Sequence, residues 1–408
     1  MTWWMKFNQF LNPRRMKYAW IAGGALWFAW LISCILGPGN MDLAGQVVGT
    51  DYITIYASGV ALRQGQSANL YNFDYQFQLE QSIAGPELTT FNAFITPPFL
   101  AWLFVPFSVL PYTWSFVAWS LLSVLFLWVS LKLLSTEKPI KAFIYSLTWF
   151  PIFATISFGE NSLLSLFILC LTYWCWRKEK YLLAGLVCSL LLYKPQLILG
   201  VGLLWLLEWR RSWRALMGLV FGGFLLFGLS IWLLPDASRA YLELVRSTIP
   251  DMVYQDQFPL WHLHSQRGFW ILLFPGQKLL VEGLSLLLSV AGIVAYIFFW
   301  RGNRKEPDLL FAGAICLTIW ITPHAMIYDW SILLIPAILF WQARPELQNI
   351  WKPLFTLVWI ATFLSGVLTY AQMMIIPFAI QISIPLLLFA LIVSFKFLIT
   401  YPPKTSYD

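Results

Sequence analysis

The stretch Thr113–Leu134 reads TWSFVAWSLLSVLFLWVSLKLL and carries a single charged residue, Lys132, near its end. A helix needs roughly 20 apolar residues to cross the hydrocarbon core of a bilayer, so this stretch is long enough to do so. Comparable runs recur along the 408 residues, of which 59% are hydrophobic and 11% charged. Soluble domains carry about 25% charged residues. The sequence therefore predicts an integral membrane protein whose main solvent is lipid.

Thirteen apolar segments are candidates for membrane helices, and several are shorter than a full span. They are Met16–Leu36, Pro97–Leu110, Thr113–Leu134, Lys141–Ile156, Ser162–Trp176, Tyr181–Tyr193, Pro195–Leu207, Ala215–Leu234, Lys278–Trp300, Leu309–Thr322, Trp330–Trp341, Leu354–Tyr370 and Pro377–Ile399. No internal repeat or soluble domain interrupts them. We therefore expect one all-helical membrane domain over residues 1–408.

Basic residues gather in four places along the chain, as they do in cytoplasmic loops under the positive-inside rule. The clusters are Lys6, Arg14, Arg15 and Lys17; Arg177, Lys178 and Lys180; Arg210, Arg211 and Arg214; and Arg301, Arg304 and Lys305. The long loop over residues 38–96 has one basic residue, Arg63, against five acidic ones. We expect it outside, together with the second long loop over residues 235–277. Because the net charge of +7 lies in these loop clusters, it does not indicate nucleic-acid binding.

Thirteen full crossings cannot place all four basic clusters inside. The segment Lys141–Ile156 runs into Ser157-Phe158-Gly159-Glu160, a stretch that breaks helices. We interpret this segment as re-entrant or half-spanning, which leaves about twelve crossings. Broken helices occur at membrane depth only where protein or a water-filled cavity covers the backbone, so the break also points to a site.

The first outer loop contains two short patterns of apolar residues at helical spacing. One, after Asp51, comprises Tyr52, Ile55, Tyr56, Gly59 and Val60; the other, after the candidate N-cap Asp74, comprises Tyr75, Leu79 and Ile83. We expect both to form amphipathic helices that lie in the plane of the membrane interface.

Asp51 is the first candidate for chemistry because it opens one of these helices at the outer face. A carboxylate at headgroup depth could meet a lipid-borne substrate. Inverting glycosyl transfer needs one such base to deprotonate the acceptor hydroxyl. The alternative is that Asp51 only caps the helix, since Asp is a favoured N-cap residue.

Lys194 interrupts an apolar run and is followed by Pro195 and Gln196. An ionisable residue between apolar helices is costly and is by default a functional hypothesis. A lysine suits a phosphate as a point charge, and the alternative is a lysine that snorkels from a helix end. Glu160 and Asn161 lie at the helix break and could hold a sugar hydroxyl, or could form only a turn.

His324, Tyr328 and Asp329 follow Pro323, which ends an apolar segment. His324 and Tyr328 are four residues apart, so we expect them on one helical face. A neutral His324 could hydrogen-bond a phosphate or an acceptor, and a charged one could stabilise a leaving phosphate; the alternative is an interfacial histidine bonded to water. Arg267, in the second outer loop, could clamp a phosphate.

The sequence lacks the motifs of metal sites, nucleotide-binding domains and serine hydrolases. His262 and His264 have no third ligand nearby, so we expect no metal site formed by the protein alone. The chain has no Walker motif, Rossmann glycine pattern or G-x-S-x-G elbow, which argues against an ATP-driven pump and a nucleotide-sugar enzyme with a Rossmann half.

Six short motifs are informative when taken together. They are Asp51-Tyr52 with Tyr56-Ala57-Ser58-Gly59; Gly65 with Leu70-Tyr71-Asn72; Thr96-Pro97-Pro98-Phe99; Gly159-Glu160-Asn161-Ser162-Leu163-Leu164; Tyr193-Lys194-Pro195-Gln196; and, more loosely, Ser265-Gln266-Arg267-Gly268. These motifs resemble those of glycosyltransferase family 87, most strongly from Asp51 to about Leu244. Tyr193–Gln196 is the most specific match. Glu160 replaces a Gln of the family pattern, and Asn72 an Asp.

The resemblance implies a GT-C-type bundle of about 12 transmembrane helices, with amphipathic helices in the first outer loop. It implies inverting transfer of a hexose, usually mannose, from a polyprenyl-phosphate donor to a lipid or glycan acceptor, without cofactor or metal. The reaction would take place on the extracytoplasmic side of a bacterial plasma membrane. The resemblance makes Asp51 the base, puts His324 near the donor phosphate, and adds Tyr56 and Gln196 to the substrate-binding residues Lys194, Glu160, Asn161, Arg267 and Tyr328.

Two other functions remain open at this point. A lipid or polysaccharide transporter would carry no chemistry, but such proteins often have pseudo-symmetric halves, which this chain does not show. A ligase that moves a whole glycan from a lipid diphosphate would need more outer arginines than the chain has.

Overall fold

The computed structural model describes residues 6, 9, 11, 13–255 and 258–400. Over these residues the chain forms α-helices and short 3-10 helices, with no β-strand. Six helices are long and apolar enough to cross a membrane. They are α2 (Pro13–Leu36), α6 (Tyr112–Leu133), α12 (Trp209–Leu233), α15 (Lys278–Gly302), α18 (Gln348–Met373) and α19 (Ser383–Thr400). The predicted all-helical membrane protein is therefore confirmed.

A seventh apolar segment is bent. Helices α7 (Pro139–Leu147) and α8 (Phe150–Phe158) meet at an angle of 72°. Pro151 lies in the first turn of α8, has no N–H to donate and cannot continue the helix from α7. Lys141–Ile156, which we interpreted as re-entrant or half-spanning from the breaker stretch after it, is thus a broken helix, and its bend lies inside the segment rather than at Ser157–Glu160.

Five shorter apolar helices pack among the long ones. They are α9 (Ser162–Arg177), α10 (Tyr181–Ser189) with η3 (Leu190–Tyr193), η4 (Pro195–Ile198) with α11 (Leu199–Leu207), α16 (Pro307–Ile321), and η7 (Ile327–Leu333) with α17 (Leu334–Ala343). Most side chains of α9 and α16 are buried, so these helices are apolar on every side because protein surrounds them.

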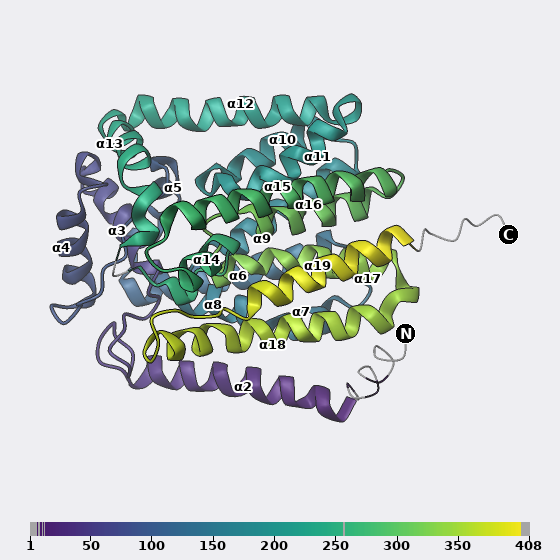
Figure 1. Ribbon diagram of the computed structural model, residues 1–408. Helices are drawn as coiled ribbons and strands as arrows, with labels where there is room; N and C mark the ends of the chain where they lie inside the picture. Colours follow the sequence, from purple (N-terminus) through teal and green to yellow (C-terminus); the bar gives the residue numbers. More distant parts are fainter. Residues whose placement is uncertain (1–5, 7–8, 10, 12, 256–257, 401–408) are drawn as a thin grey trace.

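The remaining helices are short and connect the spans. They are α3 (Tyr52–Arg63), η1 (Ser67–Asn69), α4 (Phe73–Ala84), α5 (Pro98–Phe104), η2 (Phe107–Val109), α13 (Pro235–Ser247), η5 (Ile249–Tyr254), η6 (Leu260–His262), α14 (Gln266–Leu273) and η8 (Pro345–Leu347). Figure 1 places α3, α4 and α13 together at one end of the bundle, here called the loop end. Helix α2 begins and α19 ends at the opposite end.

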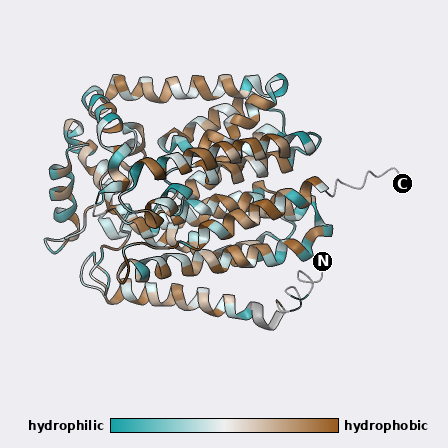
Figure 2. Cartoon of the chain, in the orientation of Figure 1, coloured by the Kyte–Doolittle hydropathy of each residue, from teal (hydrophilic) through white to brown (hydrophobic). Residues whose placement is uncertain are grey.

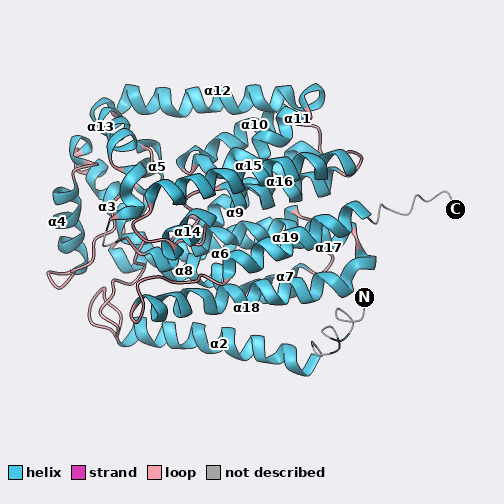
Figure 3. Ribbon diagram, viewed as in Figure 1, coloured by secondary structure: helices cyan, strands magenta, loops and turns pink. Residues whose placement is uncertain are grey.

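Polarity follows this division. Figure 2 shows hydrophobic residues along the long helices and hydrophilic residues on α4 and α13. The longest loops, drawn in pink in Figure 3, also lie at the loop end. The bundle thus has one end built from short helices and loops, which is where a polar site can form.

Two sequence expectations about the loop end need correction. Pro97–Leu110, predicted as a span, is only the seven-residue α5 and the 3-10 turn η2, because Pro106 ends the helix. Helix α4 is capped by Asn72, whose side chain accepts from the Tyr75 N–H, and not by Asp74.

Helix α3 is not the one-faced interfacial helix that its pattern predicts. All ten residues from Tyr52 to Ala61 are buried. Helix α5 packs so closely that a Cβ on Gly59 would lie 2.5 Å from the Phe104 carbonyl oxygen. Because protein covers α3 on every side, its start is fixed in position, and Asp51 immediately precedes that start.

Candidate functional site

The site begins at the tight turn between α8 and α9. Gly159 takes a left-handed conformation with φ +72°, which favours glycine, and a Cβ there would lie 2.5 Å from the Cβ of Tyr52. The indole N–H of Trp119 donates to the Gly159 carbonyl at 2.9 Å. The N–H of Asp51 donates to the Phe158 carbonyl at 3.0 Å. These contacts hold the start of α3 against the turn that carries Glu160.

Lys194 lies at the junction of η3 and η4, and its ammonium faces two carboxylates. Its Nζ donates to Asp329 Oδ1 at 2.9 Å and lies 3.3 Å from both carboxylate oxygens of Glu160. The three side chains are 11%, 3% and 15% exposed, in the order Lys194, Asp329 and Glu160. Burial and pairing decide against a lysine that snorkels to the interface, because its charge ends inside the protein.

Asp329 is the best-anchored member of this group. The Ser162 hydroxyl donates to Asp329 Oδ1 at 2.8 Å, and the Met326 N–H donates to Oδ2 at 3.0 Å. The Tyr328 ring lies 5.1 Å from Lys194 Nζ, within the range of a cation–π contact. Helices α8, α9 and η7 therefore converge on one lysine, and Glu160, Lys194, Tyr328 and Asp329 together are called the lysine cluster below.

Asp51 is half-buried beside this cluster and interacts electrostatically with it. Burial, together with the charges of Glu160 and Asp329 and against the charge of Lys194, raises the pKa of Asp51 to about 8. Although Asp51 holds the N-cap position of α3, its carboxylate makes no capping bond to any described residue. The capping alternative is thus not supported, and a carboxylate with a pKa near the working pH suits a general base.

Asn161 and Gln196 flank the lysine cluster. Asn161 is 2% exposed, and its Oδ1 has no hydrogen-bond partner in the described part of the chain. An unpaired buried oxygen is costly, so it is a candidate acceptor for a ligand hydroxyl. Gln196 is half-buried, and its backbone carbonyl accepts from the Thr322 hydroxyl at 3.5 Å.

Arg267 and His324 form a second basic pair. Arg267 donates to His324 Nε2 at 3.2 Å and to Glu282 Oε1 at 3.0 and 2.6 Å. Burial lowers the pKa of His324 to about 4, and the Arg267 charge lowers it too, so the imidazole is neutral at pH 7. When Nε2 accepts from arginine, the proton lies on Nδ1, which can donate to an anion. Of the two roles considered for His324, this favours a neutral imidazole that hydrogen-bonds a phosphate or an acceptor over a charged one that stabilises a leaving phosphate.

Two further residues differ from expectation. His324 and Tyr328 do not share a helical face, because His324 lies in the turn after α16 and Tyr328 in the 3-10 helix η7. Tyr56 is buried in the aromatic packing of α3, where its hydroxyl donates to the Leu110 carbonyl at 2.8 Å and its ring lies 5.2 Å from that of Tyr112. Among the described residues, these contacts place Tyr56 in the packing of α3 and not in the lysine cluster.

The model of glycosyltransferase family 87 matches residues 94–323, which is more than half of the chain. The chain belongs to glycosyltransferase family 87. The match includes Glu160, Asn161, Lys194, Gln196 and Arg267, and it ends one residue before His324. A search of curated proteins and a search of solved structures each returned no match.

Family 87 membership confirms the resemblance predicted from the motifs, although the matched range starts later than Asp51 and runs beyond Leu244. It makes the protein a membrane glycosyltransferase, which moves a sugar from a donor to an acceptor. Asp51 and Tyr56 precede the matched range, while Tyr328 and Asp329 follow it. The family match thus covers Lys194 but neither Asp51 nor Asp329, and it is the structure that places these two carboxylates near Lys194.

Proposed function

We propose that this family 87 protein is an inverting glycosyltransferase that moves a hexose, mannose by family resemblance, from a polyprenyl-phosphate donor to a lipid or glycan acceptor. The observation that carries the proposal is the half-buried Asp51 carboxylate, free of any capping role, next to a buried lysine at the loop end of a membrane bundle. This arrangement offers one base and one cation where a headgroup can enter.

We infer the side of the membrane that the site faces from the arrangement of the helices and the basic clusters. In this proposal we count the bent pair α7–α8 and each of the five shorter apolar helices as one crossing beside the six long helices, which makes twelve. An even number returns the chain to the side on which it began, in agreement with α2 starting and α19 ending at one end (Figure 1). The basic clusters around Arg177, Arg210 and Arg301 border helix ends on that side, and the positive-inside rule therefore supports assigning it to the cytoplasm. The loop end, with Asp51, then faces the extracytoplasmic side.

The proposed reaction needs one proton transfer. The acceptor hydroxyl oxygen attacks the anomeric carbon as the bond from that carbon to the phosphate oxygen breaks. The hydroxyl proton moves to Asp51, and polyprenyl phosphate leaves with the bonding electron pair. Attack from the face opposite the leaving group inverts the anomeric centre. Asp51 acts as general base, which is typically worth 10²–10⁴-fold in rate.

The donor phosphate must compete for Lys194, because Glu160 and Asp329 already hold its ammonium. Asp329 is held by the Ser162 hydroxyl and the Met326 N–H. Glu160 lies farther from Lys194 Nζ than Asp329 does, and its side chain is more exposed. We expect the phosphate to replace Glu160 on Lys194, which leaves Glu160 and the unpaired oxygen of Asn161 for sugar hydroxyls. Arg267 and the Nδ1–H of His324 provide further donors to the phosphate.

An apolar groove could take the isoprenoid tail. A cavity of about 290 Å³ is lined almost entirely by apolar side chains of α7, α16, α17, α18 and α19. Leu333 and Leu334 belong to this lining and follow Tyr328 and Asp329 along the same η7–α17 segment. One segment thus contributes both to the lysine cluster and to the groove.

The test uses purified protein, labelled polyprenyl-phosphate mannose and a lipid acceptor extract. Asp51→Asn and Asp51→Ala should lower transfer by at least about 10²-fold. Asp74→Asn, which removes an exposed carboxylate from α4, should leave transfer unchanged. Activity of a folded Asp51→Asn variant within a few-fold of wild type would remove Asp51 from the role. Transfer of a whole glycan from a lipid diphosphate would instead identify a ligase.

A further inference from the structure

We propose that Asn92 is a positioning residue that holds the Asp51 carboxylate for proton transfer, an inference that rests on the proposed function. The Asn92 amide Nδ2 lies 3.4 Å from Asp51 Oδ1 and donates to the Thr50 carbonyl at 3.1 Å. One amide group thus contacts the carboxylate and the backbone beside it. This contact restricts rotation of the Asp51 side chain and leaves Oδ2 to receive the acceptor proton.

Asn92 can hold Asp51 only if its own backbone is fixed. The hydroxyl of Thr54, which is 7% exposed in the first turn of α3, donates to the Asn92 carbonyl at 2.9 Å. Thr54 follows Asp51 by three residues, so the same helix end holds both the carboxylate and the loop above it. The ring of the preceding residue, Phe91, packs against Phe73 and Phe77 of α4 at 5.9 and 5.8 Å.

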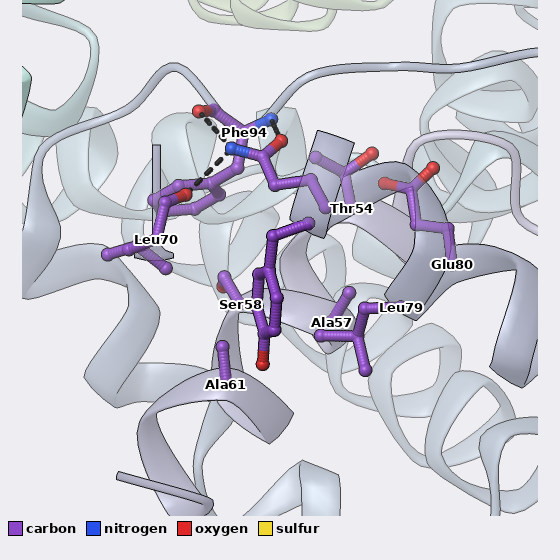
Figure 4. A pocket seen from close by; sticks show the side chains of 10 residues that line it. Thr54, Ala57, Ser58, Ala61, Leu70, Leu79, Glu80 and Phe94 are labelled. Carbon is purple, nitrogen blue, oxygen red and sulfur yellow. Dashed lines mark hydrogen bonds between the residues drawn. The ribbon is translucent and has the colours of Figure 1, made fainter. Parts of the chain in front are cut away.

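The other side of Asn92 is fixed by a buried glutamine of α4. The Phe94 N–H donates to Gln76 Oε1 at 2.8 Å, and Gln76 Nε2 donates to the Leu70 carbonyl at 2.7 Å. Figure 4 draws these bonds, with Thr54 among the side chains that line a small cavity. Gln76 is 6% exposed, so the bonds are shielded from competition with water. Although the Asn92 side chain is exposed, the segment that carries it is held on both sides.

The charges around Asp51 explain why a neutral donor is needed there. Glu160 and Asp329 face Asp51 with like charge, Lys194 faces it with opposite charge, and the phenols of Tyr112 and Tyr328 also interact with it. A hydrogen bond to the ionised form of a carboxylate lowers its pKa. Asn92 therefore opposes the effect of burial on the pKa of Asp51 and keeps a larger fraction of its carboxyl ionised. It does so without adding a cation that would compete with Lys194 for the donor phosphate.

The experiment measures kcat, KM for the lipid-phosphate sugar, and the pH dependence of kcat/KM for Asn92→Ala and Asn92→Asp in the full-length protein. Asn92→Ala should lower kcat about 10-fold with KM within about 2-fold, and should move the acid limb of the profile up by about half a pH unit or more. Asn92→Asp, which adds a carboxylate next to Asp51, should move the acid limb to still higher pH. Asn69→Ala, which removes another amide of the same loop, is the matched control.

Unchanged kcat and an unchanged acid limb in Asn92→Ala would overturn the proposal. So would a lower melting temperature with reduced activity but no shift of the acid limb, because that result assigns Asn92 a structural role only. The outcome is separable from the parent proposal. If Asp51→Asn stays active, the proposed function fails; if Asp51→Asn is inactive and Asn92→Ala is normal, only the inference about Asn92 fails.

Discussion

Glu80 is a buried carboxyl group whose ionisation should control stability at alkaline pH. It is 1% exposed, and neither carboxylate oxygen has a hydrogen-bond partner among the described residues. It lines a cavity of about 10 Å³ with Thr54, Ser58 and Tyr75, which is close to the smallest space that holds one water molecule (Figure 4). Burial is the main cause that raises the pKa of Glu80 to about 8, because the nearby Thr54 hydroxyl, which lowers it slightly, donates to the Asn92 carbonyl and not to the carboxylate.

The magnitude follows from linkage. The pKa rises from 4.5 in the unfolded chain to about 8 in the folded protein, and each unit corresponds to about 1.36 kcal/mol. The protonated carboxyl therefore stabilises the fold relative to the ionised one by up to about 5 kcal/mol. This contribution is complete below pH 4.5 and is lost as the pH rises through about 8. Glu80→Gln replaces the protonated group by a neutral one of similar shape, so it removes this pH dependence.

The assay is thermal unfolding in detergent, followed by the fluorescence of the 24 tryptophans between pH 5 and pH 9.5. Glu80→Gln should unfold within about 1 °C of wild type at pH 5 and several degrees higher at pH 9, because only wild type must bury a charge. Asp74→Asn removes an exposed charge from the same helix and should follow the wild-type profile. Asp51 titrates in the same range in wild type and in both variants, so the difference between profiles isolates Glu80.

Parallel profiles for wild type and Glu80→Gln over the whole range would refute the reasoning. A Glu80→Gln variant that is less stable than wild type at pH 9 would refute it more strongly, since an ionised Glu80 would then stabilise the fold. Addition of sodium or potassium chloride at pH 9 would show whether a cation occupies the cavity in that case.

Three further outcomes are expected. Lys194→Met should cost about 3–5 kcal/mol of folding stability and abolish transfer, because it leaves two buried carboxylates without their cation. Lys194→Arg should recover most of the stability. Chemical denaturation measures the stability of both variants, and a Met variant as stable as wild type would contradict the pairing. Gly159→Ala should destabilise by about 1–3 kcal/mol through its positive φ and its contact with Tyr52, and a neutral effect on thermal unfolding would show that the turn relaxes. Transfer should increase with pH and reach half its maximum near pH 8, where Asp51 loses its proton; a kcat/KM profile that is flat between pH 6 and pH 9 would count against Asp51 as base.

The membrane architecture could be predicted from the sequence because it depends on composition and length within single segments. That Lys141–Ile156 is not a straight span also followed from a local signal, the breaker stretch around Gly159, although the 72° bend lies earlier, just before Pro151. The surroundings of α3 could not be predicted in this way. Its pattern shows an apolar stripe, but whether protein or water covers the opposite face depends on α5, whose seven residues the same reasoning assigned to a full span.

The site residues also differ in whether local sequence or distant packing determines their surroundings. Lys194 is conspicuous as a charge in an apolar run, but its closest partner, Asp329, lies 135 residues away along the chain. Only the packing of η7 against α8 and α9 brings the two together. His324 and Tyr328 do not share a face because residues 324–326 are not helical, and Met326 instead pairs with Leu263 in an isolated antiparallel bridge, a contact distant in sequence.

Charge conservation explains why a site rich in carboxylates can handle an anionic donor. A sugar phosphodiester carries one negative charge, and the departing polyprenyl phosphate carries nearly two at neutral pH. In the proposed reaction Asp51 loses its negative charge as it takes the proton, so the total charge around Lys194 stays almost constant while the bond breaks. A carboxylate of ordinary pKa would hold that proton weakly as the phosphate gains charge. An Asp51 whose pKa is raised to about 8 by burial and by the neighbouring carboxylates holds it more tightly, so the acidic surroundings of Lys194 assist proton transfer.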